Sequence, residues 1–269
     1  MTTTNLHVGY FAHNGTEIYY ETMGEGHPLV LIHGVDIDCR MWDSSFAALS
    51  HTFKVIRFDL RGFGKTKMTA DPFSFFDDLN ALLQHLGIEQ TYVCGLSFGG
   101  YLALEFTLAH PEKVEKLVLC ASALLGHPLS PQRELAKSEF IKIVQSGDVE
   151  RGIEENVQQW LYGPGQTGER IAPEVSDLFR AMSAHAFSLP DAHNMPRFID
   201  PPVIERLGEI SAETLVLTGG LDYIDFAQIA QKLTSELQQA THIELPNTAH
   251  LFPMEVPKQF TKLLSDFLK

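Results

Sequence analysis

Cysteine and long apolar runs are both scarce in this sequence. It has three cysteines in 269 residues. This number is small and uneven, so it indicates no disulfide framework, and a reducing compartment fits. Cys94 and Cys120 each stand in an apolar strand-like run, so we expect both to be buried. No uncharged apolar run is long enough to span a bilayer, and residues 1–7 resemble no secretory signal. We therefore expect a soluble, cytoplasmic protein.

Positive charge is also in short supply. The chain has 20 Lys and Arg against 34 Asp and Glu, a formal net charge of −14. Such a charge repels the phosphates of nucleic acids and anionic membranes, so we expect neither as a partner. A small neutral or cationic substrate is admitted more easily. The histidines and cysteines lack metal-ligand spacing, so we expect no metal, and we expect no other cofactor.

Strand-like and helix-like segments alternate along much of the chain, and 44% of the residues are hydrophobic, enough for a sizeable core. Asn14-Gly15 lies between the first two strand-like runs and predicts a tight antiparallel hairpin. The later alternation implies right-handed crossovers and a parallel sheet, hence an α/β fold. The predicted strands are residues 7–11, 17–22, 28–32, 54–58, 91–94, 116–120, 214–218 and 241–245. The predicted helices include residues 41–49, 76–86, 101–108, 226–237 and 256–268.

The alternation lapses after the run at residues 116–120 for about eighty residues, far more than an ordinary connection needs. This segment has amphipathic helical patterns, is broken by a Gly-Pro-Gly sequence at 163–165, and contains no internal repeat. We interpret residues 124–202 as a helical insertion. The remaining residues, 1–123 and 203–269, then form one α/β core.

Residues 91–100 contain the motif around which the chain is organised. They read T-Y-V-C-G-L-S-F-G-G and include a G-x-S-x-G match at residues 95–99. In this pattern a strand turns sharply into a helix, with a serine at the apex in strained geometry and glycines leaving room beside it. The motif alone also occurs in plain glycine-rich turns. Here a strand-like run precedes it and a helical pattern follows it, which favours Ser97 as a nucleophile.

A serine hydroxyl needs a base to take its proton, and the chain has twelve histidines. His250 follows the last predicted strand by a few residues, at the edge of the sheet where Ser97 also lies. His33 belongs to the same edge, but it stands in a His-Gly turn directly after its strand. The chain order that the motif requires favours His250 as the base, and we expect His33 to brace the loops.

Two aspartates compete for the role of the acid that orients the histidine. Asp222 lies on the loop after the strand at residues 214–218, and Asp225 is three residues further on. We prefer Asp222, because Asp225 stands where a helix is about to start and can serve as its N-cap. The resulting chain order is serine, acid, histidine, which is that of one known nucleophile-elbow architecture.

With these residues in place, the chain resembles the α/β-hydrolase fold superfamily, and the resemblance extends from residue 29 to the C-terminus. The landmarks are His33-Gly34, Asp59-Leu60-Arg61-Gly62-Phe63-Gly64, the serine turn at Ser97, Asp222 and His250. The sequence departs mildly from the family pattern at two places. Lys65-Thr66 follows Gly64 where relatives of the esterase and lactonase type often have serine, and Ala249 precedes His250 where they have glycine.

The resemblance implies a mostly parallel central sheet flanked by helices, with residues 124–202 as a helical cap over the site. It also implies that the backbone N–H groups of Val35 and Phe98 form an oxyanion hole. The expected activity is that of a cofactor-independent carboxylic ester hydrolase, acting through an acyl-enzyme on an ester or lactone of a small, largely apolar molecule. The superfamily also hosts carbon–carbon bond hydrolases and perhydrolases, and a ligand receptor or signalling protein with slow turnover is a further alternative.

Overall fold

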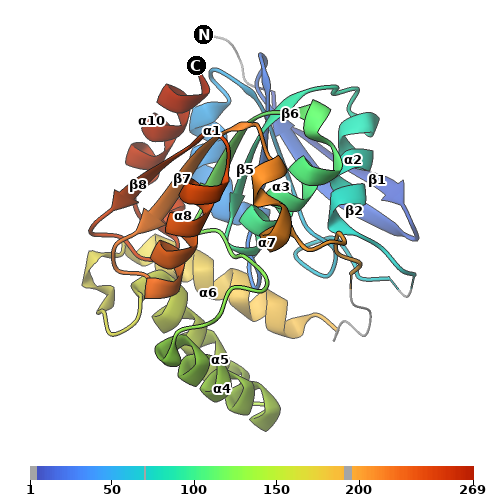
Figure 1. Cartoon of the computed structure of the whole chain (residues 1–269). Coiled ribbons are helices and arrows are strands. Elements are labelled where there is room, and N and C mark those ends of the chain that lie inside the picture. The colour runs from blue at the N-terminus through green and yellow to red at the C-terminus, as the bar shows by residue number, and fades with distance from the viewer. Residues whose placement is uncertain (1–4, 70, 191–195) are drawn as a thin grey trace.

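A computed structural model describes residues 5–69, 71–190 and 196–269, so small parts of the predicted core (residues 1–123 and 203–269) and of the predicted insertion (residues 124–202) lie outside the described residues. Eight strands form one sheet flanked by helices (Figure 1). The strands are β1 (His7–His13), β2 (Thr16–Met23), β3 (Pro28–Ile32), β4 (Lys54–Phe58), β5 (Thr91–Leu96), β6 (Val114–Cys120), β7 (Glu213–Gly219) and β8 (Ala240–Leu245). Their order is β1-β2-β4-β3-β5-β6-β7-β8. The α/β class predicted from the sequence is confirmed.

The sheet is antiparallel only where β2 pairs with β1 and β4, and every other neighbouring pair is parallel. The predicted hairpin turn is confirmed, because Asn14 and Gly15 both have positive φ angles, 41° and 77°, as a tight two-residue turn requires. β3 and β4 begin and end at the predicted residues, and the other strands differ from the prediction by at most two residues at either end.

Apolar side chains from alternate positions of the buried strands pack on opposite faces of the sheet. Leu29 and Leu31 belong to one cluster, whereas Val30 and Ile32 belong to the other. Helices α2, α3 and most of α8 cover one face, and α1 and α10 cover the other (Figure 1). These helices, with two short ones near them, are α1 (Asp43–Leu49), α2 (Phe75–His85), α3 (Phe98–Ala109), α7 (Val203–Arg206), α8 (Ile224–Glu236), α9 (Phe252–Glu255) and α10 (Pro257–Leu268).

The segment between β6 and α7, predicted as the helical insertion, is helical over most of its described length. Its longest helices lie together below the sheet in Figure 1. Val157, Leu161, Phe179 and Met182 are buried and join the cluster that contains Leu31. Its elements are α4 (Pro131–Ser146), α5 (Val149–Asn156), the π-helix η3 (Val157–Tyr162), the short 3-10 helix η4 (Gly168–Arg170) and α6 (Pro173–Ser188).

The cysteines are buried as predicted. Cys94 and Cys120 are fully buried on the neighbouring strands β5 and β6, with their Sγ atoms 3.8 Å apart, and both are free thiols. Among the described helices, none combines the length and the apolar character that crossing a membrane requires.

A buried carboxyl group in α3 should make the stability of the protein depend on pH. Glu105 is fully buried, and its Oε1 accepts a hydrogen bond of 2.6 Å from the N–H of Ile199, on the chain segment that leads into α7. Its Oε2 has no partner among the described residues. Burial raises the pKa of Glu105 from 4.5 to about 7, although the Ile199 N–H acts in the opposite direction.

We expect Glu105→Gln to become more stable relative to the wild type as the pH rises from about 5 to about 8. In the wild type, the folded state binds the carboxyl proton of Glu105 more tightly than the unfolded state does. The stabilisation from this proton is therefore complete below the pKa of the unfolded state and is lost as the pH rises through the pKa of the folded state. The difference between the two proteins should change by up to about 3 kcal/mol, measured by urea unfolding at both pH values. A difference that is independent of pH would contradict this assignment.

Candidate active site

Ser97 stands at the sharp turn between β5 and α3. Its φ and ψ angles are 55° and −117°, a conformation that residues with a side chain rarely adopt. A Cβ on Gly95 would lie 2.1 Å from the carbonyl oxygen of Gly99, and one on Gly99 would lie 2.4 Å from that of Ile32. The two glycines of the motif are therefore required by close packing, and the strained turn predicted from the sequence is confirmed.

His250 and Asp222 lie on the loops that follow β8 and β7, and a hydrogen bond of 2.6 Å joins His250 Nδ1 to Asp222 Oδ2. The side chains are 4% and 1% exposed, so water competes little for this bond. The other oxygen of Asp222 accepts a hydrogen bond of 2.8 Å from the N–H of Tyr223. Because a carboxylate can only accept, the proton of the imidazole lies on Nδ1, and Nε2 is left as the basic nitrogen.

Ser97 and His250 line one small cavity of about 50 Å³. No hydrogen bond joins the two side chains, and such a bond is often long or poorly aligned before a substrate binds. The cavity wall is mostly apolar and combines loops of the core with helices of the insertion. Its other lining residues are Gly34, Val35, Ile37, Leu96, Arg133, Trp160, Phe179 and Leu251.

Val35 and Phe98 are predicted to form an oxyanion hole. Phe98 follows Ser97 directly in the chain, and Val35 lines the same cavity as Ser97. Phe98 is the first residue of α3, where the N–H groups have no partner within the helix. Val35 follows β3 and lines the cavity. Neither N–H donates a hydrogen bond to any residue that the structure describes. Both are therefore available to an oxygen atom.

His33 has the bracing role that the sequence predicts. Its ring is fully buried, Nδ1 donates to the carbonyl oxygen of Gly34 at 2.7 Å, and Nε2 accepts from the N–H of Leu60 at 3.0 Å. These bonds connect the loop after β3 to the loop after β4. Burial lowers the pKa of His33. With both ring nitrogens bonded, His33 has no free nitrogen to act as a base.

The predicted N-cap role of Asp225 is wrong. α8 begins at Ile224 with Tyr223 as its N-cap, so Asp225 already lies inside the first turn. Its fully buried carboxylate accepts hydrogen bonds from the N–H and the hydroxyl of Ser130, at 2.8 and 2.6 Å. Ser130 is the N-cap of α4. Asp225 therefore anchors the insertion to the core, and its oxygens are occupied away from His250.

Glu255, which no sequence pattern indicated, supports the histidine loop. Its Oε1 accepts a hydrogen bond of 2.9 Å from the N–H of Ala249, and Arg170 of the insertion donates to its Oε2 at 3.1 Å. Burial raises the pKa of Glu255 to about 7, although Arg170 and the Ala249 N–H both act in the opposite direction. Glu255 lies in a helix of four residues, too short for any periodic pattern to indicate its role.

One group among the described residues has the side chains to hold a metal ion. One ligand atom from each of Asp38, Cys39 and Asp59 lies within 4.8 Å of the others. The two carboxylates are already in use: Asp59 accepts from the N–H groups of Cys39 and Lys65, and Asp38 pairs with the guanidinium of Arg40. The cluster organises the loops that follow β3 and β4.

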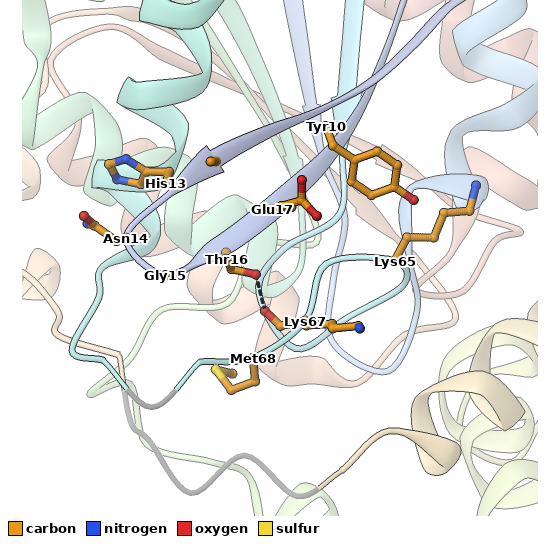
Figure 2. Close-up of a pocket in the computed structure, with 10 residues that line it drawn as sticks. Tyr10, His13, Asn14, Gly15, Thr16, Glu17, Lys65, Lys67 and Met68 are labelled. Carbon is orange, nitrogen blue, oxygen red and sulfur yellow. Dashed lines mark hydrogen bonds between the residues drawn. The ribbon is translucent and has the colours of Figure 1, made fainter.

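A larger cavity, of about 750 Å³, lies away from Ser97. It is lined by the β1–β2 hairpin and by the loop around Lys67, and Thr16 Oγ1 donates to the carbonyl oxygen of Lys67 across one wall (Figure 2). None of Ser97, Asp222 and His250 borders it. A large volume does not by itself indicate a reactive site, and Ser97 and His250 line the smaller cavity.

The sequence signature of the α/β-hydrolase fold matches residues 27–257, and the chain belongs to this family. It is 29% identical to 2-hydroxy-6-oxononadienedioate/2-hydroxy-6-oxononatrienedioate hydrolase 1 of Pseudomonas putida, over 93% of this chain and 91% of that protein. It is 25% identical to the pimeloyl-[acyl-carrier protein] methyl ester esterase of Nitrosospira multiformis, over 90% and 95%. The structure is similar to a thermophilic esterase from Thermogutta terrifontis, with a TM-score of 0.76 and 26% identity over 97% and 98%.

Proposed function

We propose that this protein is a cofactor-independent serine hydrolase that cleaves an ester or lactone bond of a small, largely apolar molecule. The observation that carries the proposal is the 2.6 Å bond from His250 to the buried Asp222, beside a strained serine that lines the same cavity as His250. A basic Nε2 next to a serine hydroxyl is the arrangement that makes serine a nucleophile.

In the proposed mechanism, Ser97 Oγ attacks the carbonyl carbon while His250 Nε2 takes its proton. Asp222 then stabilises the imidazolium, and the N–H groups of Val35 and Phe98 donate to the developing oxyanion. His250 returns the proton to the leaving alcohol, which leaves an acyl group on Ser97. Water activated by His250 releases the acid and restores the serine.

The cavity wall supports a largely apolar substrate, and we propose that the insertion selects it. Trp160 and Phe179 come from η3 and α6 of the insertion, and Ile37, Leu96 and Leu251 come from the core. Apolar walls with few polar groups are typical of small-molecule sites. Residues 124–202 therefore serve as a cap in this proposal.

A carbon–carbon bond hydrolase would use the same three residues, and the Pseudomonas putida relative keeps this alternative open. A perhydrolase or a ligand receptor with slow turnover is also compatible with the family. The enzymes among these alternatives differ in the substrate that they turn over. A receptor differs from all of them, because its ligand raises its thermal stability but is cleaved slowly.

Turnover of short esters and lactones tests the proposal. We expect the wild type to cleave at least one short-chain chromogenic ester or small lactone with a kcat of about 1 s⁻¹ or more. The control is the Ser97→Ala variant, which reports cleavage by other groups. If no ester or lactone is cleaved faster by the wild type than by this variant, the proposed function is wrong.

A further inference from the structure

Arg133 of the insertion lies beside the residues that form the active site. Its guanidinium carbon is 4.7 Å from the ring centre of Phe226 and 4.9 Å from that of Trp160. The same two rings lie 4.4 and 4.8 Å from the ring of His250. Arg133 also lines the cavity that contains Ser97. Two aromatic rings thus hold a positive charge next to the reacting groups.

Among the residues that the structure describes, the Arg133 guanidinium has no hydrogen-bond or ion-pair partner. No described residue accepts a hydrogen bond from it or forms an ion pair with it. Asp222 and Asp225 are near enough to favour its charge, yet their oxygens are bonded to His250, to the Tyr223 N–H and to Ser130. A guanidinium has five N–H donors, and none of them is used by the described residues.

Arg133 also stands where a positive charge is costly. It is the third residue of α4, and the N-terminus of a helix disfavours a cation. Burial lowers the pKa of Arg133, although Asp222 and Asp225 act in the opposite direction. A structural contact alone could be made by an uncharged side chain of similar size, which would avoid both costs. An anion that arrives with the substrate would offset them.

Arg133 and Trp160 stand at the junction of two cavities. Beyond them lies a second cavity of about 160 Å³, whose wall includes Lys137 and Phe140. Asp36 is the single acid among the described residues of its wall. Burial raises the pKa of Asp36, although a hydrogen bond with Asn156 acts in the opposite direction. A group that extends from Ser97 past Arg133 therefore meets two cations, Arg133 and Lys137, and one carboxyl group whose pKa is raised by burial.

We propose that Arg133 binds a carboxylate of the substrate, so that the preferred ester or lactone carries a negative charge on a short apolar chain. This inference rests on the proposed function, whose substrate class it narrows. The overall charge of −14 suggests a neutral or cationic substrate, but the charge that a bound carboxylate meets is local. A guanidinium suits a carboxylate because it can donate two parallel hydrogen bonds.

The test compares two esters of the same shape and different charge. Monoethyl glutarate carries a carboxylate, and ethyl glutaramate carries an uncharged amide in its place. We expect the wild type to prefer the anionic ester, and Arg133→Gln to lower the ratio of the two kcat/KM values by about 10- to 100-fold, mainly through KM. Arg133→Lys should retain part of the preference. The matched control is Lys142→Gln, an exposed cation on the same helix, which should leave the ratio unchanged.

A binding measurement separates this proposal from the proposed function. Calorimetric titration of monoethyl glutarate into Ser97→Ala measures affinity without turnover, and adding Arg133→Gln should weaken it by about 10- to 100-fold. If neither ester is cleaved, the proposed function loses support, and this titration alone decides on Arg133. Equal binding to both proteins, or an unchanged ratio in Arg133→Gln, would overturn the proposal. A variant that loses both esters equally, with a lower melting temperature, would show that Arg133 only holds the cap.

Discussion

Replacing Ser97 with alanine should lower kcat for a short ester by about 10⁴-fold or more, roughly 5 kcal/mol of transition-state stabilisation. The reason is that the variant retains the cavity, His250 and both N–H donors but has no atom to attack the carbonyl. Alanine occupies the same backbone position, so we expect the fold to persist. Steady-state kinetics together with the thermal unfolding transition measures both effects.

Ser122→Ala is the matched control for this change. Ser122 is a buried serine on the loop after β6, close to Gly100, and its hydroxyl donates to the carbonyl oxygen of Ala123. It does not line the cavity that contains Ser97. The control should keep nearly the full rate. A near-normal rate in Ser97→Ala, or a comparable loss in Ser122→Ala, would contradict the role of Ser97.

Replacing His250 with alanine should lower kcat as far as Ser97→Ala does, because the hydroxyl is a poor nucleophile without its base. The double variant Ser97→Ala/His250→Ala should lose little more than either single variant, since residues that act as a unit are not additive. Kinetics of the three variants with one ester form the measurement. A double variant that loses the product of the two single effects would mean that the residues act independently.

Variants of Asp222 and Asp225 test which of the two aspartates orients His250 and which one anchors the insertion. Asp222→Asn should cost less activity than His250→Ala but more than Asp225→Asn, because Asp222 bonds directly to the imidazole. Asp225→Asn should mainly weaken the contact with Ser130 and lower the melting temperature. Kinetics and thermal unfolding of the two variants provide the test. A larger activity loss in Asp225→Asn would reverse the assignment of the acid.

The strands and the serine turn could be predicted from the sequence because their signals are local. β3 is a short apolar run, and β4 has apolar side chains at Val55, Ile56 and Phe58; a buried strand needs little more than this to be recognised. Gly95 is required by backbone packing within a few residues, whereas Gly99 packs closely against the backbone of Ile32 on the neighbouring strand β3. Chain order then placed Asp222 and His250 on loops at the same edge of the sheet, where the structure brings them together.

The contacts between distant segments could not be predicted in the same way. Ser130 and Asp225 are 95 residues apart, and a periodic pattern indicates which face of a helix is buried but not which partner it meets. The error at Asp225 arose from a helix start that differs by two residues from the predicted one. The rings around Arg133 come from η3 and α8, so the position of its charge depends on the tertiary fold alone.

In the proposed mechanism, a single serine activated by His250 carries the reaction. The most direct test of this claim is labelling with a serine-directed fluorophosphonate, followed by mass spectrometry of the digested protein. We expect one adduct, on Ser97, and much slower labelling of His250→Ala, because the attack on phosphorus needs the same base. An adduct on another residue, or equally fast labelling without His250, would contradict the claim.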